Sequence, residues 1–110
     1  MVTEGPGDRL VATILAALEE GPAHGYLIAR RIRQWSEGAW ALREGSLYPV
    51  LHDLEAAGLL TAVEERQGER SRRVYSLTPQ GRTRLAEERE RWRRQVRVLE
   101  RVLWRERTGG

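Results

Sequence analysis

Apolar side chains recur at helical spacing in three segments of the first half of the chain. In residues 8–20 they fall at i, i+3, i+4 and i+7 positions, which predicts an amphipathic helix that Asp8 can cap. Gly21 and Pro22 then indicate a turn, and residues 25–36 predict a second helix. The side chains expected on the buried face of this second helix are Ile28, Ile32 and Trp35.

A third helix is predicted within REGSLYPVLHDLEAAGLL, residues 43–60, with Ser46 as a favourable N-cap. Pro49 is expected in the first turn, where an amide N–H would have had no partner within the helix. Tyr48 and His52 share helical spacing on a face that points away from the core. The core-facing positions are Leu47, Val50, Leu51 and Leu54.

A β-hairpin is predicted after the third helix. The runs LLTAVEE and RRVYSL are rich in Val, Thr and Tyr, and the glycine-containing segment RQGERS joins them. Several arginines lie at or beside the hairpin tip, among them Arg70, Arg72 and Arg73. Because alternate side chains of a strand point to opposite faces, one of Arg72 and Arg73 could instead cover apolar surface with its stem.

The last predicted helix is the longest. Thr78 is its expected N-cap, Pro79 suits the first helical position, and no helix breaker follows until about Arg107. A helix of about 28 residues would be ~40 Å long, which is longer than the rest of a small domain needs. A short apolar seam on this helix predicts packing against a second copy of the chain. The seam consists of Leu85, Trp92, Val96, Leu99 and Leu103.

Three helices followed by a hairpin with a basic tip are the element order of a winged helix-turn-helix. We therefore predict a mainly α-helical fold with a small β-hairpin, a winged helix-turn-helix at residues 8–77 and a long C-terminal dimerisation helix at residues 78–107. In such a fold the third helix enters the major groove of DNA, and the wing loop lies along the phosphate backbone.

The composition excludes several other classes of protein. The chain of 110 residues contains no cysteine and two histidines, so thiolate metal sites and cysteine nucleophiles are excluded, and we expect neither a metal site nor a cofactor. No serine–histidine–acid arrangement or glycine-rich phosphate loop is indicated, so no enzyme is expected. The longest mostly apolar run, LVATILAAL, is too short to span a bilayer, and the acidic start is unlike a signal peptide. We expect a cytoplasmic protein without a membrane partner.

The distribution of charge favours a nucleic-acid partner at the hairpin. All 19 cations are arginines. GC-rich codon usage is the simpler explanation of this bias, but arginine also binds phosphate and guanine through two parallel hydrogen bonds. The first turn of the predicted third helix is uncharged, since no acid lies between Gly45 and His52. The candidate DNA-binding residues are Ser46, Tyr48, Pro49, His52, Arg70, Ser71, Arg72 and Arg73.

Four stretches, HGYLIARRI, EGSLYPVLHDLEAAGLL, RRVYSLTPQG and RWRRQVRVL, resemble the PadR-type transcriptional regulators, and the resemblance extends from about Leu10 to Leu103. It implies a homodimeric repressor that binds a near-palindromic operator in double-stranded DNA. It also implies that a small aromatic or cationic effector could enter between the subunits, near Trp92. Tyr48 and Pro49 correspond to the recognition-helix pair of the family.

Several alternatives remain open at this stage. Tyr48 could pack under the wing, and Tyr26 is expected to be a packing residue. Trp92 could belong to a plain dimer core, in a regulator without an effector. The ten arginines of residues 82–110 alternate with five glutamates, which is typical of a solvated face with ion pairs. The winged module could also bind a protein partner and no DNA.

Overall fold

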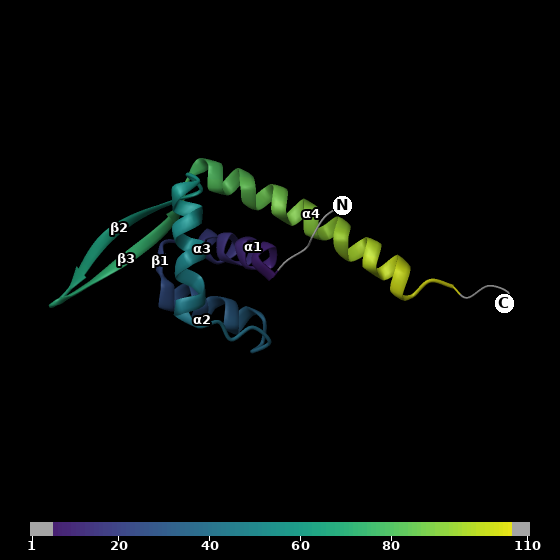
Figure 1. Cartoon of the computed structure of the whole chain (residues 1–110), viewed down its shortest axis with the longest axis horizontal. Helices are drawn as coiled ribbons and strands as arrows, with labels where there is room; N and C mark the ends of the chain where they lie inside the picture. Colours follow the sequence, from purple (N-terminus) through teal and green to yellow (C-terminus); the bar gives the residue numbers. More distant parts are fainter. Residues whose placement is uncertain (1–5, 107–110) are drawn as a thin grey trace.

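The computed structural model describes the backbone of residues 6–106 and the side chains of residues 9–106. Within that range the chain forms a winged module of helices and a small sheet, which is followed by one long helix (Figure 1). The elements are α1 (Pro6–Glu19), β1 (Ala23–His24), α2 (Gly25–Trp35), α3 (Glu44–Ala56), β2 (Leu60–Gln67), β3 (Arg70–Leu77) and α4 (Pro79–Leu103). The predicted winged helix-turn-helix with a long C-terminal helix is confirmed.

The hairpin and the last helix extend from the three-helix body in opposite directions (Figure 1). The strands form an antiparallel sheet in the order β1-β3-β2, with Leu60 opposite Leu77 at its base and Gln67 opposite Arg70 near its tip. Strand β1 was not predicted, because two residues carry no alternation that a sequence pattern could reveal. It pairs Ala23 with Tyr75 and so joins the start of α2 to the wing.

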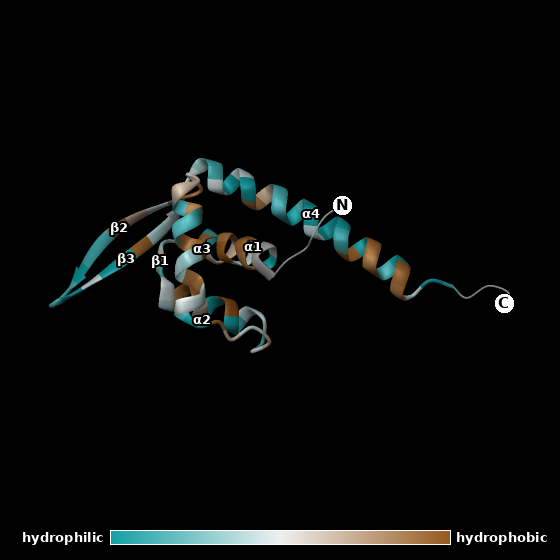
Figure 2. Cartoon of the chain, viewed as in Figure 1, coloured by the Kyte–Doolittle hydropathy of each residue, from teal (hydrophilic) through white to brown (hydrophobic). Residues whose placement is uncertain are grey.

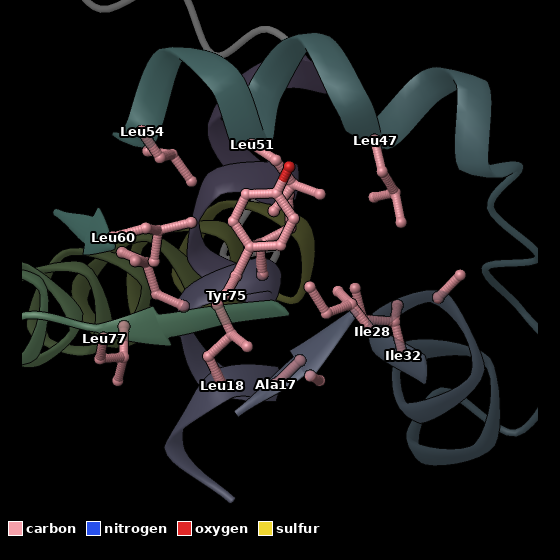
Figure 3. Packing of buried hydrophobic residues seen from close by; sticks show 14 of the residues in the cluster. Ala17, Leu18, Ile28, Ile32, Leu47, Leu51, Leu54, Leu60, Tyr75 and Leu77 are labelled. Atoms are coloured by element: carbon pink, nitrogen blue, oxygen red, sulfur yellow. The ribbon is translucent and has the colours of Figure 1, made fainter. Parts of the chain in front are cut away.

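Every helix and strand contributes to one apolar core. Figure 3 shows side chains of α3 pointing towards the ring of Tyr75, which lies among leucines of α1, β2 and β3. Burial raises the pKa of Tyr75, since the interior disfavours a phenolate. The predicted core-facing residues Leu47, Leu51 and Leu54 are all buried.

Helix α3 begins three residues earlier than predicted. Its N-cap is Arg43, which has extended backbone angles (φ −87°, ψ 145°) and no side-chain capping bond, so the prediction of Ser46 as N-cap is wrong. Pro49 consequently lies in the second turn and not in the first. It removes the donor for the carbonyl of Gly45, which is exposed, so water can take the place of that hydrogen bond.

Two other helix predictions also differ from the structure. Helix α1 begins at Pro6, so Asp8 lies in its first turn, and the side chain of Asp8 is outside the described residues. Trp35 is 52% exposed, so its assignment to the buried face of α2 is wrong. Because α2 ends at Trp35, its indole lies beyond the core, in a shallow cleft beside Trp40.

The predicted start of α4 is confirmed. Thr78 Oγ1 accepts from the amide of Gly81 at 3.0 Å and donates to the carbonyl of Gly58 at 2.7 Å, and Pro79 follows at the first helical position. Gly81 lies against the backbone of Leu59, where an added Cβ would be 2.1 Å from the carbonyl oxygen. This contact fixes α4 against the chain segment that precedes the wing.

Gly81→Ala should lower the free energy of unfolding by about 1–3 kcal/mol, although alanine normally stabilises a helix, because the methyl group would overlap the backbone of Leu59. Gly45→Ala is the matched control, since a Cβ there meets nothing within 4 Å. It should raise stability by about 0.5–1 kcal/mol. Urea unfolding of both variants measures the difference, and equal effects would contradict the described contact.

Candidate nucleic-acid interface

Tyr48 lies half-exposed across the start of α2. Its ring is close to Gly25, where an added Cβ would be 3.1 Å from the tyrosine hydroxyl. The hydroxyl donates to Glu44 Oε2 at 3.0 Å, one helical turn earlier. Partial burial raises the pKa of Tyr48 most, and the hydrogen bond to Glu44 raises it further. The hydroxyl therefore keeps its proton at neutral pH. Tyr48 is 44% exposed and is therefore not sealed under the wing.

The other candidate residues of α3 are exposed on the same helix. Ser46, Pro49 and His52 all present their side chains to solvent. Neither the Ser46 hydroxyl nor the His52 ring forms a hydrogen bond with another residue between 9 and 106. These polar groups are free to bind an external partner.

The four candidate residues of the wing divide into two pairs. Ser71 Oγ donates to Glu64 Oε2 at 2.6 Å, and this bond, together with Arg73, holds the pKa of Glu64 below its usual value. Arg73 donates to Glu55 Oε2 at 2.6 Å and to Glu64 Oε1 at 3.3 Å, so it ties the wing to the C-terminal half of α3. The Glu55 carboxylate raises the pKa of Arg73. Arg70 and Arg72 alternate with this pair and form no ion pair in the part of the chain that the structure describes.

His24 connects the start of α2 with the wing. Its Nδ1 accepts from the amide of Leu27 at 3.3 Å and so caps α2. Its Nε2 lies 2.9 Å from Nη1 of Arg72. A neutral imidazole has a single acceptor nitrogen, so it cannot accept from both donors at the same time. The guanidinium of Arg72 is therefore weakly held and can move to a better acceptor.

A cleft of about 370 Å³ separates α3 from the wing, and Tyr26 contributes to its wall. Tyr26 is 57% exposed, and its ring stacks on His24 with centroids 6.2 Å apart, so the prediction of a packing role for Tyr26 is wrong. The cleft is lined by His24, Tyr26, Glu44, Tyr48, Arg70, Ser71, Arg72 and Arg73. The sequence pattern missed the contributions of His24 and Glu44, although both lie in the quoted motifs HGY and EGSLYP.

A second cleft, of about 650 Å³, continues from the first along α2. It shares Tyr26 and Glu44 with the first cleft and adds Arg30 and Arg33. These two arginines form no ion pair with another described residue. The surface from the wing to the end of α2 therefore carries unpaired positive charge on both sides of the first turn of α3.

The predicted seam on α4 is only partly available to a second subunit. Leu85 is 3% exposed and packs in the core of its own chain, so its assignment to a dimer interface is wrong. The first turns of α4 lie on α1, which explains this burial. Further along the helix, Val96, Leu99 and Leu103 are exposed, and Figure 2 shows an apolar segment near the C-terminal end of α4.

Trp92 lies between these two parts of α4 and is half-buried. Its Nε1 donates to Glu88 Oε1 at 3.2 Å, and the guanidinium of Arg91 lies 4.8 Å from the ring centroid. Burial favours the neutral acid at Glu88, but hydrogen bonds from Arg91 and Arg84 outweigh it and lower the pKa of this carboxyl. The expected ion pairs of the solvated face are also present, for example Arg93 with Glu90.

A family model described as the transcriptional regulator PadR-like family matches residues 14–87 of this chain. The chain belongs to the PadR-like family of transcriptional regulators. The match includes α2, α3 and the whole wing, and it ends in the first part of α4. This family consists of transcriptional regulators and not of enzymes.

Individual PadR-like relatives agree with this assignment. Transcriptional regulator Rv3488 of Mycobacterium tuberculosis is 38% identical over 76 residues, which are 69% of this chain and 68% of the relative. A PadR family transcription regulator from Clostridium difficile is 28% identical, with a TM-score of 0.74 over 86% of this chain and 97% of that structure. Bacillus subtilis PadR, solved in complex with operator DNA, is 28% identical, with a TM-score of 0.66 over 72% of this chain and 45% of that chain.

No helix within residues 6–106 is long and apolar enough to cross a membrane. In the same range, no three His, Asp or Glu side chains converge in a way that could hold a metal ion.

Proposed function

We propose that this PadR-like regulator is a repressor that binds a near-palindromic operator in double-stranded DNA as a homodimer. The observation that carries the proposal is the cleft between α3 and the wing, where exposed polar groups of α3 lie near Arg70 and Arg72, neither of which forms an ion pair within residues 9–106. The operator complex of Bacillus subtilis PadR supports it by analogy. The alternative is a winged module whose arginines bind an acidic protein partner, and failure to bind any operator would favour it.

In the proposed complex, the exposed face of α3 lies in the major groove. The Ser46 hydroxyl contacts phosphate near the helix N-terminus, and Tyr48 contacts base edges through its ring, since its hydroxyl proton is already donated to Glu44. Pro49 offers an apolar edge to a thymine methyl group, and His52 continues the same face one turn later. The exposure of all four side chains supports this assignment.

We assign different roles to the two pairs of wing residues. Arg70 and Arg72 bind phosphate, and Arg72 exchanges its contact with His24 for a charged acceptor. Ser71 and Arg73, which the sequence alone also assigned to DNA, instead hold the wing in position through Glu64 and Glu55. Two carboxylates already balance the charge of Arg73, so it gains less from a phosphate than Arg70 or Arg72 does.

The homodimer is proposed to form through α4. Residues 8–77 act as the DNA-binding unit, and residues 78–107 act as the dimerisation helix. Val96, Leu99 and Leu103 of one subunit would pack on the second subunit, near apolar clefts over α1 that are lined by Trp40 and Trp92. Dimerisation through α4 would hold the two α3 helices at a fixed separation, which must match successive major grooves about 34 Å apart.

Tyr48→Ala should lower operator affinity about tenfold, because it removes both a DNA contact and the hydroxyl that orients Glu44. Far-UV circular dichroism and the size of the dimer should be unchanged, since Tyr48 is outside the core. Fluorescence anisotropy with a labelled operator measures the change. Unaltered operator affinity would show that α3 does not contact the DNA.

The proposed function includes release from DNA by a planar cationic effector. The cleft of about 330 Å³ between α1 and α4 is lined by two indoles, Trp40 and Trp92, and by the buried carboxylate of Glu88. Each indole already holds a guanidinium, Arg9 at Trp40 and Arg91 at Trp92, so both rings suit flat cations. In a variant that keeps Trp40 and Trp92 and replaces Trp35 and Trp104, ethidium should quench the fluorescence in a saturable way. Absence of quenching would leave a regulator without this effector site.

A further inference from the structure

Glu44 is one of two acidic side chains, with Glu37, that line the two clefts, whose other charged side chains are arginines. It lies in the first turn of α3 and lines both clefts, which together contain the arginines Arg30, Arg33, Arg70 and Arg72. Glu44 nevertheless forms no ion pair with any residue that the structure describes. Its one hydrogen bond from a side chain comes from the hydroxyl of Tyr48, through Oε2.

This arrangement orients the carboxylate without neutralising it. The bond from Tyr48 holds Glu44 on the exposed face of α3, and Oε1 has no side-chain donor among residues 9–106. A first-turn carboxylate gains about 0.3–1 kcal/mol from the helix dipole, but this gain does not require an orientation towards the clefts. Near DNA, the same charge is repelled by phosphates, so it weakens binding to any sequence that gives it no donor.

The donors that the major groove can offer are few. Cytosine presents its N4 amino group, and adenine presents its N6 amino group beside the acceptor N7. Guanine presents two acceptors, and thymine presents an acceptor and a methyl group. A carboxylate accepts hydrogen bonds and donates none, so the cytosine edge suits it best and the guanine edge suits it least.

We propose that Glu44 is a specificity-determining residue, which accepts a hydrogen bond from the N4 amino group of a cytosine in each half-site. The inference rests on the proposed DNA-binding function and adds one base preference to it. Tyr48 acts as the positioning residue for this carboxylate. The hydrogen bond between Glu44 and cytosine adds affinity. Because acceptor edges repel the carboxylate, Glu44 also weakens binding to sites with another base at that position.

The test is selection of bound duplexes from a randomised DNA library by three full-length proteins: the wild type, Glu44→Gln and Glu87→Gln. The wild type should select cytosine at one position of each half-site. In Glu44→Gln that preference should weaken about fivefold or more, because an amide both donates and accepts. Affinity for unrelated DNA should rise in the same variant. Glu87→Gln removes the same charge from an exposed position of α4 and should keep the wild-type profile.

Selection with the Tyr48→Phe variant provides a second test, in which the charge of the protein is unchanged. This replacement removes the hydroxyl that orients Glu44 and should weaken the cytosine preference at the same position and at no other. Wild-type selectivity with an unchanged profile in Glu44→Gln would overturn this inference and leave the proposed function intact. A wild type that selects no sequence would overturn the proposed function, and this inference with it.

Discussion

Replacing Leu99 by glutamate is expected to convert the dimer into monomers and to reduce operator affinity at least about 100-fold. Leu99 is an exposed apolar side chain on the part of α4 that extends beyond the domain. A carboxylate there would have to be buried in the proposed interface without a partner. A monomer binds one half-site, so it loses the second binding event, which a fixed dimer makes intramolecular. Sedimentation equilibrium and anisotropy titration measure the two effects.

Arg94→Glu is the control for Leu99→Glu. It places a carboxylate on the same helix at an exposed position outside the apolar seam. It should leave the dimer intact and change affinity much less than Leu99→Glu. A dimeric Leu99→Glu protein with full operator affinity would show that α4 does not join the subunits in the proposed way.

The double replacement Arg70→Ala with Arg72→Ala should weaken binding to all DNA sequences and flatten its salt dependence. Each phosphate contact contributes about 0.9 to the slope of log K against log salt, so two contacts should reduce its magnitude by about two per subunit. Neither arginine forms an ion pair within residues 9–106, so the fold should lose little stability. Anisotropy titrations at several salt concentrations measure the slope.

The matched control removes the same charge from α4 by Arg94→Ala with Arg97→Ala. Both residues are exposed, and the structure gives no reason for them to reach the operator. Their replacement should reduce long-range attraction while leaving the slope close to that of the wild type. Equal flattening in the two double variants would mean that the wing contributes only through net charge.

The element order was predictable because it depends on strong, local signals. The periodic apolar residues of α1 and α3, the hairpin composition and the Thr78-Pro79 start of α4 are each visible in a short stretch. The start of α3 was not predictable in this way. Ser46 is a better intrinsic cap than Arg43, but the chain already has helical geometry at Glu44. Tertiary contacts fix the first turn there, and an exposed glycine carbonyl tolerates Pro49 one turn later.

The site itself was less predictable, because it depends on which groups pair within the protein. Composition does not distinguish Arg70, Arg72 and Arg73. Only the alternation of side chains along β3 separates Arg72, which contacts His24, from Arg73, which binds Glu55. The burial of Leu85 depends on where α4 crosses α1, and the apolar seam in the sequence gives no information about that crossing. The role of Glu44 was not predicted, because a single acid in a motif does not indicate a function until its spatial neighbours are known.

Two copies of this chain are expected to bind a two-fold symmetric DNA site through α3 and the wing. The most direct measurement is selection of bound fragments from the source genome at about physiological salt, followed by footprinting and determination of the stoichiometry. The account predicts two subunits on inverted half-sites whose centres are about 34 Å, or one helical turn, apart. Equal retention of all fragments, or a single subunit on an asymmetric site, would contradict it.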